Sequence, residues 1–186
     1  MRLAHVDWIA TLIDCVSATT CWLTGLNGRF GNLVEPILLK TSNRGATRQD
    51  HSNLPGSHST NPAIAYALQD ISCVSAASCV AVGGPNQAGG KGTVVATSNG
   101  GRTWTRFASA KLDNFQSVSA YNAQSGGNGG PQALDGTANG GKSWSIVTAS
   151  PGNFDEGSVA CLTVNLCVAT TDDGLWLTTD DGGLAG

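Results

Sequence analysis

The stretch Thr97-Ser98-Asn99-Gly100-Gly101-Arg102-Thr103-Trp104 recurs 40 residues later as Thr137-Ala138-Asn139-Gly140-Gly141-Lys142-Ser143-Trp144. A weaker copy spans Thr41 to Arg48, and a further copy begins at Thr179, so the four starting positions lie 56, 40 and 42 residues apart. A repeat of about 40 to 45 residues is the period of a β-propeller blade. The sequence therefore predicts an all-β chain, a single β-propeller domain or propeller fragment over residues 1–186 with about four repeat units of 40–56 residues.

Each repeat also contains four short strand signals. In the best-preserved unit these signals cover 70–74, 79–82, 93–97 and 103–107, and each is rich in Val, Thr or aromatic residues. Four antiparallel strands in about 40 residues make one propeller blade. The pair Gly100-Gly101 falls between the last two strands, where a hairpin turn requires positive φ. We interpret the recurring motif as a turn that shapes each blade and carries no chemistry of its own.

The cysteines form a second repeat, in phase with the first. They make three pairs with a spacing of six residues: Cys15 and Cys21, Cys73 and Cys79, and Cys161 and Cys167. The remaining unit has Ala120 and Gly126 at these positions, and this joint loss is what a local bridge predicts, because a half-cystine without its partner is a reactive thiol. We predict three disulfides and an extracellular or periplasmic location. Three pairs of buried thiols in a reducing cytosol are the alternative, and zinc fits less well because no His lies near a cysteine at ligand spacing.

The composition is that of an extracellular all-β chain and excludes two kinds of partner. Among 186 residues there are 25 Gly, one Met and 12% charged residues. No apolar stretch approaches the length that spans a bilayer, so we expect no membrane partner. A net charge of −3 without a basic patch argues against nucleic acid. The first residues carry a charge where a signal peptide needs its apolar run, so the paired cysteines alone indicate export.

The turn motif resembles the Asp-box, or BNR, repeat of sialidase-like and photosystem II assembly-factor-like β-propellers, Ser/Thr-x-Asp-x-Gly-x-Thr-Trp. The resemblance covers the chain from about Ile13 onward, with Asn43, Asn99 and Asn139 where the family has Asp, which only Asp181 retains. Family propellers commonly have six or seven blades. The resemblance thus implies a fragment, an unusually small ring, or a homo-oligomer that completes the ring, and the break in the last box favours truncation.

Sialidase chemistry is not expected from this resemblance. In the family that activity requires three arginines that grip a carboxylate, a Tyr with a Glu partner as nucleophile, and an Asp acid/base. The chain lacks the Arg-Ile-Pro signature, and its only tyrosines are Tyr66 and Tyr121.

An insertion at about residues 48–62 accounts for the longest interval and holds two of the three histidines. Long polar loops on a rigid scaffold are where function tends to reside. We expect His51 or His58 to act as a general base, with Asp50 as its orienting partner. The alternative is a disordered surface loop whose histidines are solvated.

The last 44 residues are strongly acidic. After Lys142 the chain has six carboxylates and no Lys, Arg or His. Four of these carboxylates, among neighbouring Asn and Gly carbonyls, offer the oxygen ligands that Ca²⁺ prefers: Asp172, Asp173, Asp180 and Asp181. Because Asp-Asp-Gly is also a common turn sequence, a structural role for the same residues stays open.

Three functions are compatible with these features. The first is a hydrolase of a lactone, ester or sugar-type small molecule, in which Ca²⁺ polarises a carbonyl and a His or Asp activates water. The second is a non-catalytic extracellular module that binds a sugar or a protein, with Trp22, Tyr121 and Trp176 as stacking faces. The third is a fragment of a larger propeller with no activity of its own. The histidine loop and the acidic segment favour the hydrolase.

Overall fold

The computed structural model describes residues 8–27, 35–58, 65–85, 92–108, 115–122, 125–130, 133–137, 145–149, 158–163, 166–170 and 176–179. These residues form four antiparallel sheets, each a simple meander of consecutive strands. The first sheet contains β1 (Trp8–Cys15), β2 (Cys21–Asn27), β3 (Glu35–Thr41) and β4 (Gln49–Asp50). The second contains β5 (Tyr66–Cys73), β6 (Cys79–Pro85), β7 (Thr93–Thr97) and β8 (Thr105–Ala108). The third contains β9 (Ser117–Asn122), β10 (Ser125–Gly130), β11 (Ala133–Thr137) and β12 (Ser145–Ala149), and the fourth β13 (Val159–Cys161), β14 (Cys167–Thr170) and β15 (Trp176–Thr179).

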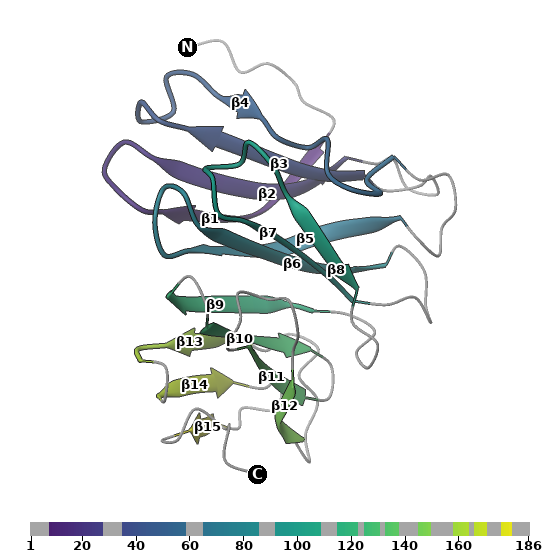
Figure 1. The fold of residues 1–186 in the computed structure, drawn as a ribbon, viewed down its shortest axis with the longest axis vertical. Helices are drawn as coiled ribbons and strands as arrows, with labels where there is room; N and C mark the ends of the chain where they lie inside the picture. The colour runs from purple at the N-terminus through teal and green to yellow at the C-terminus, as the bar shows by residue number, and fades with distance from the viewer. Residues whose placement is uncertain are drawn as a thin grey trace.

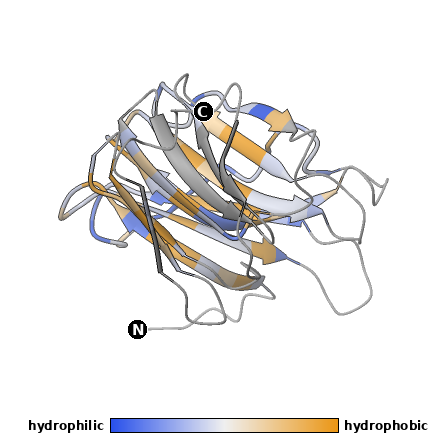
Figure 2. Ribbon diagram, turned by 90° about the horizontal axis from the view of Figure 1, so that it is seen from below, coloured by the Kyte–Doolittle hydropathy of each residue, from blue (hydrophilic) through white to orange (hydrophobic). Residues whose placement is uncertain are grey.

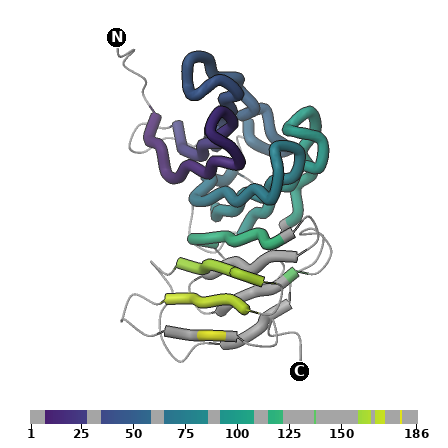
Figure 3. The backbone as a smooth tube through the Cα atoms, turned by 90° about the vertical axis from the view of Figure 1, so that its left-hand side faces the viewer, coloured from purple at the N-terminus to yellow at the C-terminus, as the bar shows by residue number. Residues whose placement is uncertain are grey.

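The four sheets are successive blades of a β-propeller architecture. The first sheet lies at one end of the molecule, the second follows it, and the third and fourth sheets lie together at the other end (Figures 1 and 3). Hydrophobic residues gather along the strands, as the colouring of Figure 2 shows. The antiparallel, four-stranded blades expected from the repeat are confirmed in the first three sheets, and the fourth sheet has three strands among the described residues.

Three disulfides close the hairpins between the first and second strands of three blades. They join Cys15 to Cys21, Cys73 to Cys79 and Cys161 to Cys167, as expected from the spacing. In the third blade Ala120 pairs with Gly126 in the same register, which places both residues at the cysteine positions. Disulfides persist in oxidising compartments, so the bridges indicate an environment outside the reducing cytosol. Among the described residues, no helix is long and apolar enough to cross a membrane.

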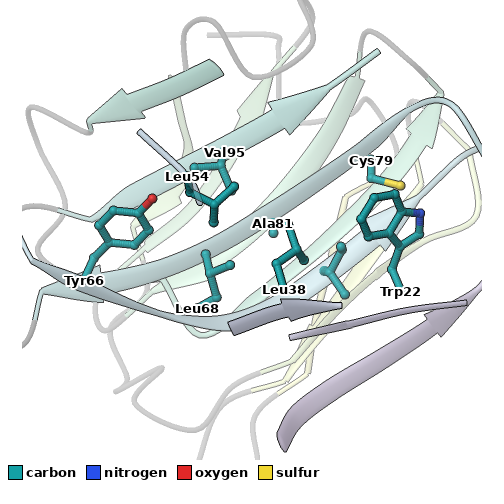
Figure 4. Packing of buried hydrophobic residues seen from close by; sticks show 9 residues of the cluster. Trp22, Leu38, Leu54, Tyr66, Leu68, Cys79, Ala81 and Val95 are labelled. Carbon is teal, nitrogen blue, oxygen red and sulfur yellow. The ribbon is translucent and has the colours of Figure 1, made fainter. Parts of the chain in front are cut away.

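The largest hydrophobic cluster lies between the first and second blades. The first blade contributes Trp22 and Leu38, and the second contributes the buried side chains of β5, β6 and β7 (Figure 4). Alternate residues of a strand point to opposite faces, so Trp22 and Leu38 share one face of the first blade while their neighbours Leu23 and Leu39 lie on the other.

Part of the 48–62 insertion belongs to this core. Its first residues form β4, which completes the first blade by pairing with Leu39 and Lys40 of β3. Leu54 is then buried in the cluster, and Ser57 is buried beside it and accepts the Leu54 N–H at 3.2 Å. The segment 48–58 is therefore an ordered part of the scaffold that covers the junction of the first two blades.

Candidate binding site at the inner strands

The blades are joined through their first strands by one recurring hydrogen bond. Each blade has a first cysteine of its hairpin, or Ala120 in its place in the third blade. The side chain of the residue directly before this position accepts a hydrogen bond from the backbone N–H at the equivalent position of the next blade. The three bonds join Cys73 N to Asp14 Oδ2 (2.6 Å), Ala120 N to Ser72 Oγ (3.0 Å) and Cys161 N to Ser119 Oγ (2.9 Å). We refer to these bonds, together with those of the next paragraph, as the interblade ladder.

In a second set of bonds the accepting side chain lies two residues before the accepting residue of the first set. Asp70 Oδ2 accepts the Val118 N–H at 2.8 Å and the Ser117 hydroxyl at 2.9 Å. Ser117 Oγ in turn accepts the Val159 N–H at 3.3 Å. The ladder satisfies backbone donors on the free edges of the first strands, which would otherwise be unpaired.

The inner strands of all four blades line one open pocket of about 340 Å³. The first blade supplies Leu12, Ile13 and Asp14, the second Asp70, Ile71 and Ser72, and the other two supply Gln116, Ser117, Val118, Ser158 and Val159. The lining thus combines two carboxylates, several hydroxyls and an amide with a few aliphatic side chains, and none of its described residues is Lys, Arg or His.

The two carboxylates differ in their surroundings. Asp70 is only 5% exposed, and burial raises the pKa of its carboxyl above 3.8, with a further contribution from the charge of Asp14. Hydrogen bonds from Val118, Ser117 and Ile71 act in the opposite direction, because they stabilise the ionised form. Asp14 is half-buried, and its Oδ2 accepts the Cys73 N–H. Asp14 therefore offers the more accessible negative charge at the pocket.

His51 lies away from this pocket, at the rim between the first two blades. Its Nδ1 lies 3.0 Å from the Gly101 carbonyl oxygen, and since a carbonyl only accepts, Nδ1 carries the hydrogen. The ring centroid is 5.0 Å from that of Trp22. Burial lowers the pKa of His51, and the neighbouring Lys40 charge adds to this shift. Neutral His51 therefore links its blade to the turn of the next one.

The other two residues of the expected catalytic group have separate partners. Asp50 Oδ1 accepts the Ser52 N–H at 2.8 Å, and hydrogen bonding to Ser52 lowers the pKa of Asp50. The carboxylate interacts with His51 through charge alone. His58 is exposed, and its Nδ1 lies 3.2 Å from Glu35 Oε1. The structure thus brings Asp50 near His51, whereas the ring of His58 contacts a different carboxylate.

The expected aromatic binding residues have different environments. Trp22 is fully buried between the blades and packs edge-on against Trp104 with centroids 5.5 Å apart, so its ring is part of the core. Tyr121 is exposed on β9, as a stacking residue must be. Trp176 begins β15, and its side chain lies outside the described residues.

The acidic residues expected to bind Ca²⁺ are Asp172, Asp173, Asp180 and Asp181, and all four lie outside the described residues. Within the ranges that the structure describes, no group of three His, Cys, Asp or Glu side chains comes together as a metal-binding cluster. The calcium site stays a prediction from the sequence.

Sequence reasoning missed the carboxylates of the inner strands. A signal was available, because Asp14, Ser72 and Ser119 occupy the same position of three successive repeats, directly before the first cysteine position. A short polar residue that occurs at the same position of successive repeats, next to a disulfide, indicates that its side chain makes a structural or ligand contact there.

Comparisons with known proteins identify the fold. No protein-family model matches the chain, and no curated protein sequence does. The solved structure described as YCF48 bound to D1 peptide is similar over 96% of this chain and 58% of that one, with a TM-score of 0.58 and 15% identity. A GH74 enzyme from Niastella koreensis is similar over 91% of this chain and 30% of that one, with a TM-score of 0.51 and 14% identity. The chain thus spans about three fifths and three tenths of the lengths of these two structures.

Proposed function

We propose that the chain is a binding module whose inner-strand pocket holds a polypeptide segment bearing a positively charged side chain. One observation carries the proposal: all four blades converge on a pocket where, among the described lining residues, the ionisable groups are the carboxylates of Asp14 and Asp70. A cation placed there meets negative charge that no base among these described residues offsets.

The remaining lining residues suit a Lys or Arg side chain. Leu12 and Ile13 are exposed aliphatic side chains at the pocket and can cover the apolar stem of such a residue. Gln116 and the serine hydroxyls offer acceptors for its N–H groups. A guanidinium or ammonium hydrogen-bonded to a carboxylate forms a charge-assisted bond, which is stronger than a neutral one.

The fold comparison is compatible with such a role. The YCF48 structure is described as bound to a D1 peptide, so a structure with this architecture holds a polypeptide segment. Likeness of fold is weak support for function, and the proposal therefore rests on the pocket lining. The Asp-box family resemblance of the turns enters the proposal in the same way, as an architectural relation.

The test is a binding measurement with matched peptides. We expect a fluorescently labelled Arg- and Lys-containing peptide to bind the oxidised chain, and a peptide with Glu at the basic positions to bind far more weakly. Asp14→Asn removes the charge and keeps an oxygen to accept the Cys73 N–H. We expect it to weaken binding about tenfold, the effect of one lost charge-assisted bond.

The matched control is Asp50→Asn. Asp50 also accepts a backbone N–H, that of Ser52, but it lies outside the pocket lining. We expect this variant to bind the basic peptide as the wild type does. Equal affinity for the acidic and basic peptides, or equal losses in the two variants, would contradict the proposed function.

A calcium-assisted hydrolase is a second candidate, favoured by the proximity of Asp50 to His51. Its general base is the less supported part, because His51 Nδ1 is bonded to Gly101 O and its Nε2 is buried. The calcium ligands proposed for it are Asp172, Asp173, Asp180 and Asp181. A panel of lactones and esters, assayed with Ca²⁺ and with chelator, tests this candidate.

A further inference from the structure

The turn between β3 and β4 departs from the recurring turn motif at its fourth and eighth positions. In the second blade these positions are Gly100 and Trp104, and the third blade also has Gly and Trp there. The turn of the first blade has Arg44 and Arg48 instead, and both side chains are exposed. The change is one of residue identity, so it does not depend on which blades are adjacent.

Arg44 has a backbone conformation that favours glycine. Its φ is 61°, and among the described residues it is the one residue other than glycine with a positive φ. Gly100, at the same position of the second blade, has a φ of 73° without a Cβ that opposes it. A strained residue that a glycine could replace is a reason to look for a function of its side chain.

The packing of the first two blades brings these arginines near further cations. Lys40 Nζ donates to Gly100 O at 3.0 Å and His51 Nδ1 to Gly101 O, so the first blade contacts the turn of the second. Arg102 follows in that turn and is exposed, although its blade has a neighbour on either side. We refer to the four basic residues of these two turns and of β3 as the basic turn face: Lys40, Arg44, Arg48 and Arg102.

The turns and hairpins around this face contain no carboxylate. The turns 41–48 and 97–104 and the hairpins 15–21 and 73–79 lie within the described residues and have neither Asp nor Glu. Backbone hydrogen bonds join each turn to the hairpin of its own blade. Asp50, which follows the first turn, accepts a backbone N–H. Within the part of the chain that the structure describes, none of the three guanidinium groups of the face has an ion-pair partner.

We propose that the basic turn face binds a polysaccharide that carries carboxylate groups, a polyuronate. This inference goes beyond the proposed function and holds whether or not the inner-strand pocket binds a peptide. A guanidinium group presents a planar fork of N–H donors that matches a carboxylate, so exposed arginines suit a chain with one carboxylate on each sugar. The disulfides indicate an environment outside the reducing cytosol, which is compatible with an extracellular polymer.

The surroundings of the face favour a polysaccharide over an acidic polypeptide. Protein partners are held chiefly by large side chains that fill desolvated pockets. The exposed large hydrophobic residues of the described chain lie outside these turns and hairpins: Ile9, Leu12, Ile13, Tyr121, Leu162 and Leu166. The two turns instead expose small hydroxyl side chains, among them Ser42, Thr47 and Thr103. Hydroxyl groups donate and accept hydrogen bonds, as the hydroxyls of a sugar do.

The experiment is a titration of fluorescently labelled polygalacturonate with the full, oxidised chain at low salt, followed by anisotropy. We expect binding that weakens as added salt screens the charges. Neutral dextran should not bind, and polyglutamate, which carries the same carboxylates on a polypeptide, should bind far more weakly.

The variants separate binding from folding. Arg44→Gly removes the charge and supplies the residue that the backbone favours, so its melting temperature should equal or exceed that of the wild type. We expect it to bind polygalacturonate about fivefold more weakly, the upper range for an exposed ion pair. Arg102→Gln should lose about as much, and the double variant about 25-fold. His58→Gln, at an exposed histidine that contacts the first residue of β3, is the control and should bind as the wild type does.

Three results would overturn the proposal. The first is a wild type that does not bind polygalacturonate at low salt, and the second is unchanged affinity in both arginine variants. The third is equal affinity for polyglutamate, which would assign the face to an acidic polypeptide. Asp14→Asn, the variant that tests the inner-strand pocket, should not weaken polygalacturonate binding, so failure of one proposal is distinguishable from failure of the other.

Discussion

At the residue scale, His51 connects the insertion to the packing of two blades. Its Nδ1–H donates to Gly101 O, and its ring packs on Trp22, over which Lys40 Nζ lies 4.8 Å from the ring centroid. The buried Nε2 has no hydrogen-bond partner among the described residues. Protonating Nε2 would place a second cation beside Lys40 in a site with little water, which is why burial favours the neutral ring.

This environment predicts a pH dependence of stability. Because the pKa of His51 is lower in the folded state than its ordinary value of 6.5, the unfolded state binds the proton more tightly. We expect the free energy of unfolding to be highest above pH 6.5, to fall as the pH drops from 6.5 toward the lower folded-state pKa, and to level off below that pKa. His51→Gln should remove this slope in denaturant titrations, whereas His58→Gln, at an exposed histidine, should retain it. Equal slopes in wild type and His51→Gln would contradict the assignment.

Single residues were the hardest level to predict from sequence. The polar character of 48–62 predicted an accessible loop with His51 as a base, but Leu54 draws the segment into the core and the ring hydrogen-bonds to a backbone carbonyl 50 residues away. The sequence assigned no role to Asp70, although its carboxylate accepts three hydrogen bonds. One comes from Ile71 N–H in its own strand, and two come from Ser117 and Val118 of the next blade. Such partners depend on which strands become neighbours, and spacing along one chain does not contain that information.

At the element scale, the first two recurring turns have the same hydrogen bonds. Asn43 Oδ1 accepts the Thr47 N–H at 2.8 Å, and Asn99 Oδ1 accepts the Thr103 N–H at 3.0 Å. In both turns the first Thr hydroxyl accepts the N–H of the glycine four residues later. In both turns one asparagine oxygen therefore fixes the chain at the end of the motif, and the same side-chain bonds shape the two turns.

The two glycines provide a matched pair of substitutions. Gly45 and Gly101 have φ of 82° and 86°, so an alanine is strained at either position, by about 1 to 2 kcal/mol. A Cβ at position 45 meets nothing, whereas one at position 101 meets the Trp22 and His51 rings. We expect Gly101→Ala to cost about 1 to 3 kcal/mol more than Gly45→Ala, the cost of overpacking, in urea unfolding. Equal losses would show that backbone strain alone acts at both turns.

Elements were predictable because their signals are local. The disulfide spacing, the paired replacement by Ala120 and Gly126, and the strand composition all lie within one hairpin. The structure has the predicted strands of the second blade with shifted ends, since β5 begins at Tyr66 and β8 covers Thr105–Ala108. The sequence did not predict β4, a strand of two residues inside the insertion that pairs with β3. A two-residue strand has too short a pattern to be read from sequence.

At the scale of the whole molecule, the acidic C-terminal segment is the main untested feature. If Asp172, Asp173, Asp180 and Asp181 hold Ca²⁺ in the folded chain alone, then a hundredfold excess over the dissociation constant should raise the free energy of unfolding by about 2.7 kcal/mol. Thermal unfolding with Ca²⁺ and with chelator measures this shift, and Asp180→Asn/Asp181→Asn should reduce it. Identical unfolding in both conditions would leave the turn interpretation of these residues.

The interblade ladder also bears on how such a chain can arise and be altered. In most of its bonds the hydrogen-bond donor is a backbone amide of the following blade, which every residue except proline possesses, and only the preceding blade must supply a particular accepting side chain. A gene segment encoding one blade can therefore be duplicated, deleted or exchanged without compensating changes in the blade that follows it. The joint replacement of a cysteine pair in the third blade, with the ladder intact on both sides, is an example of such independent drift within one unit.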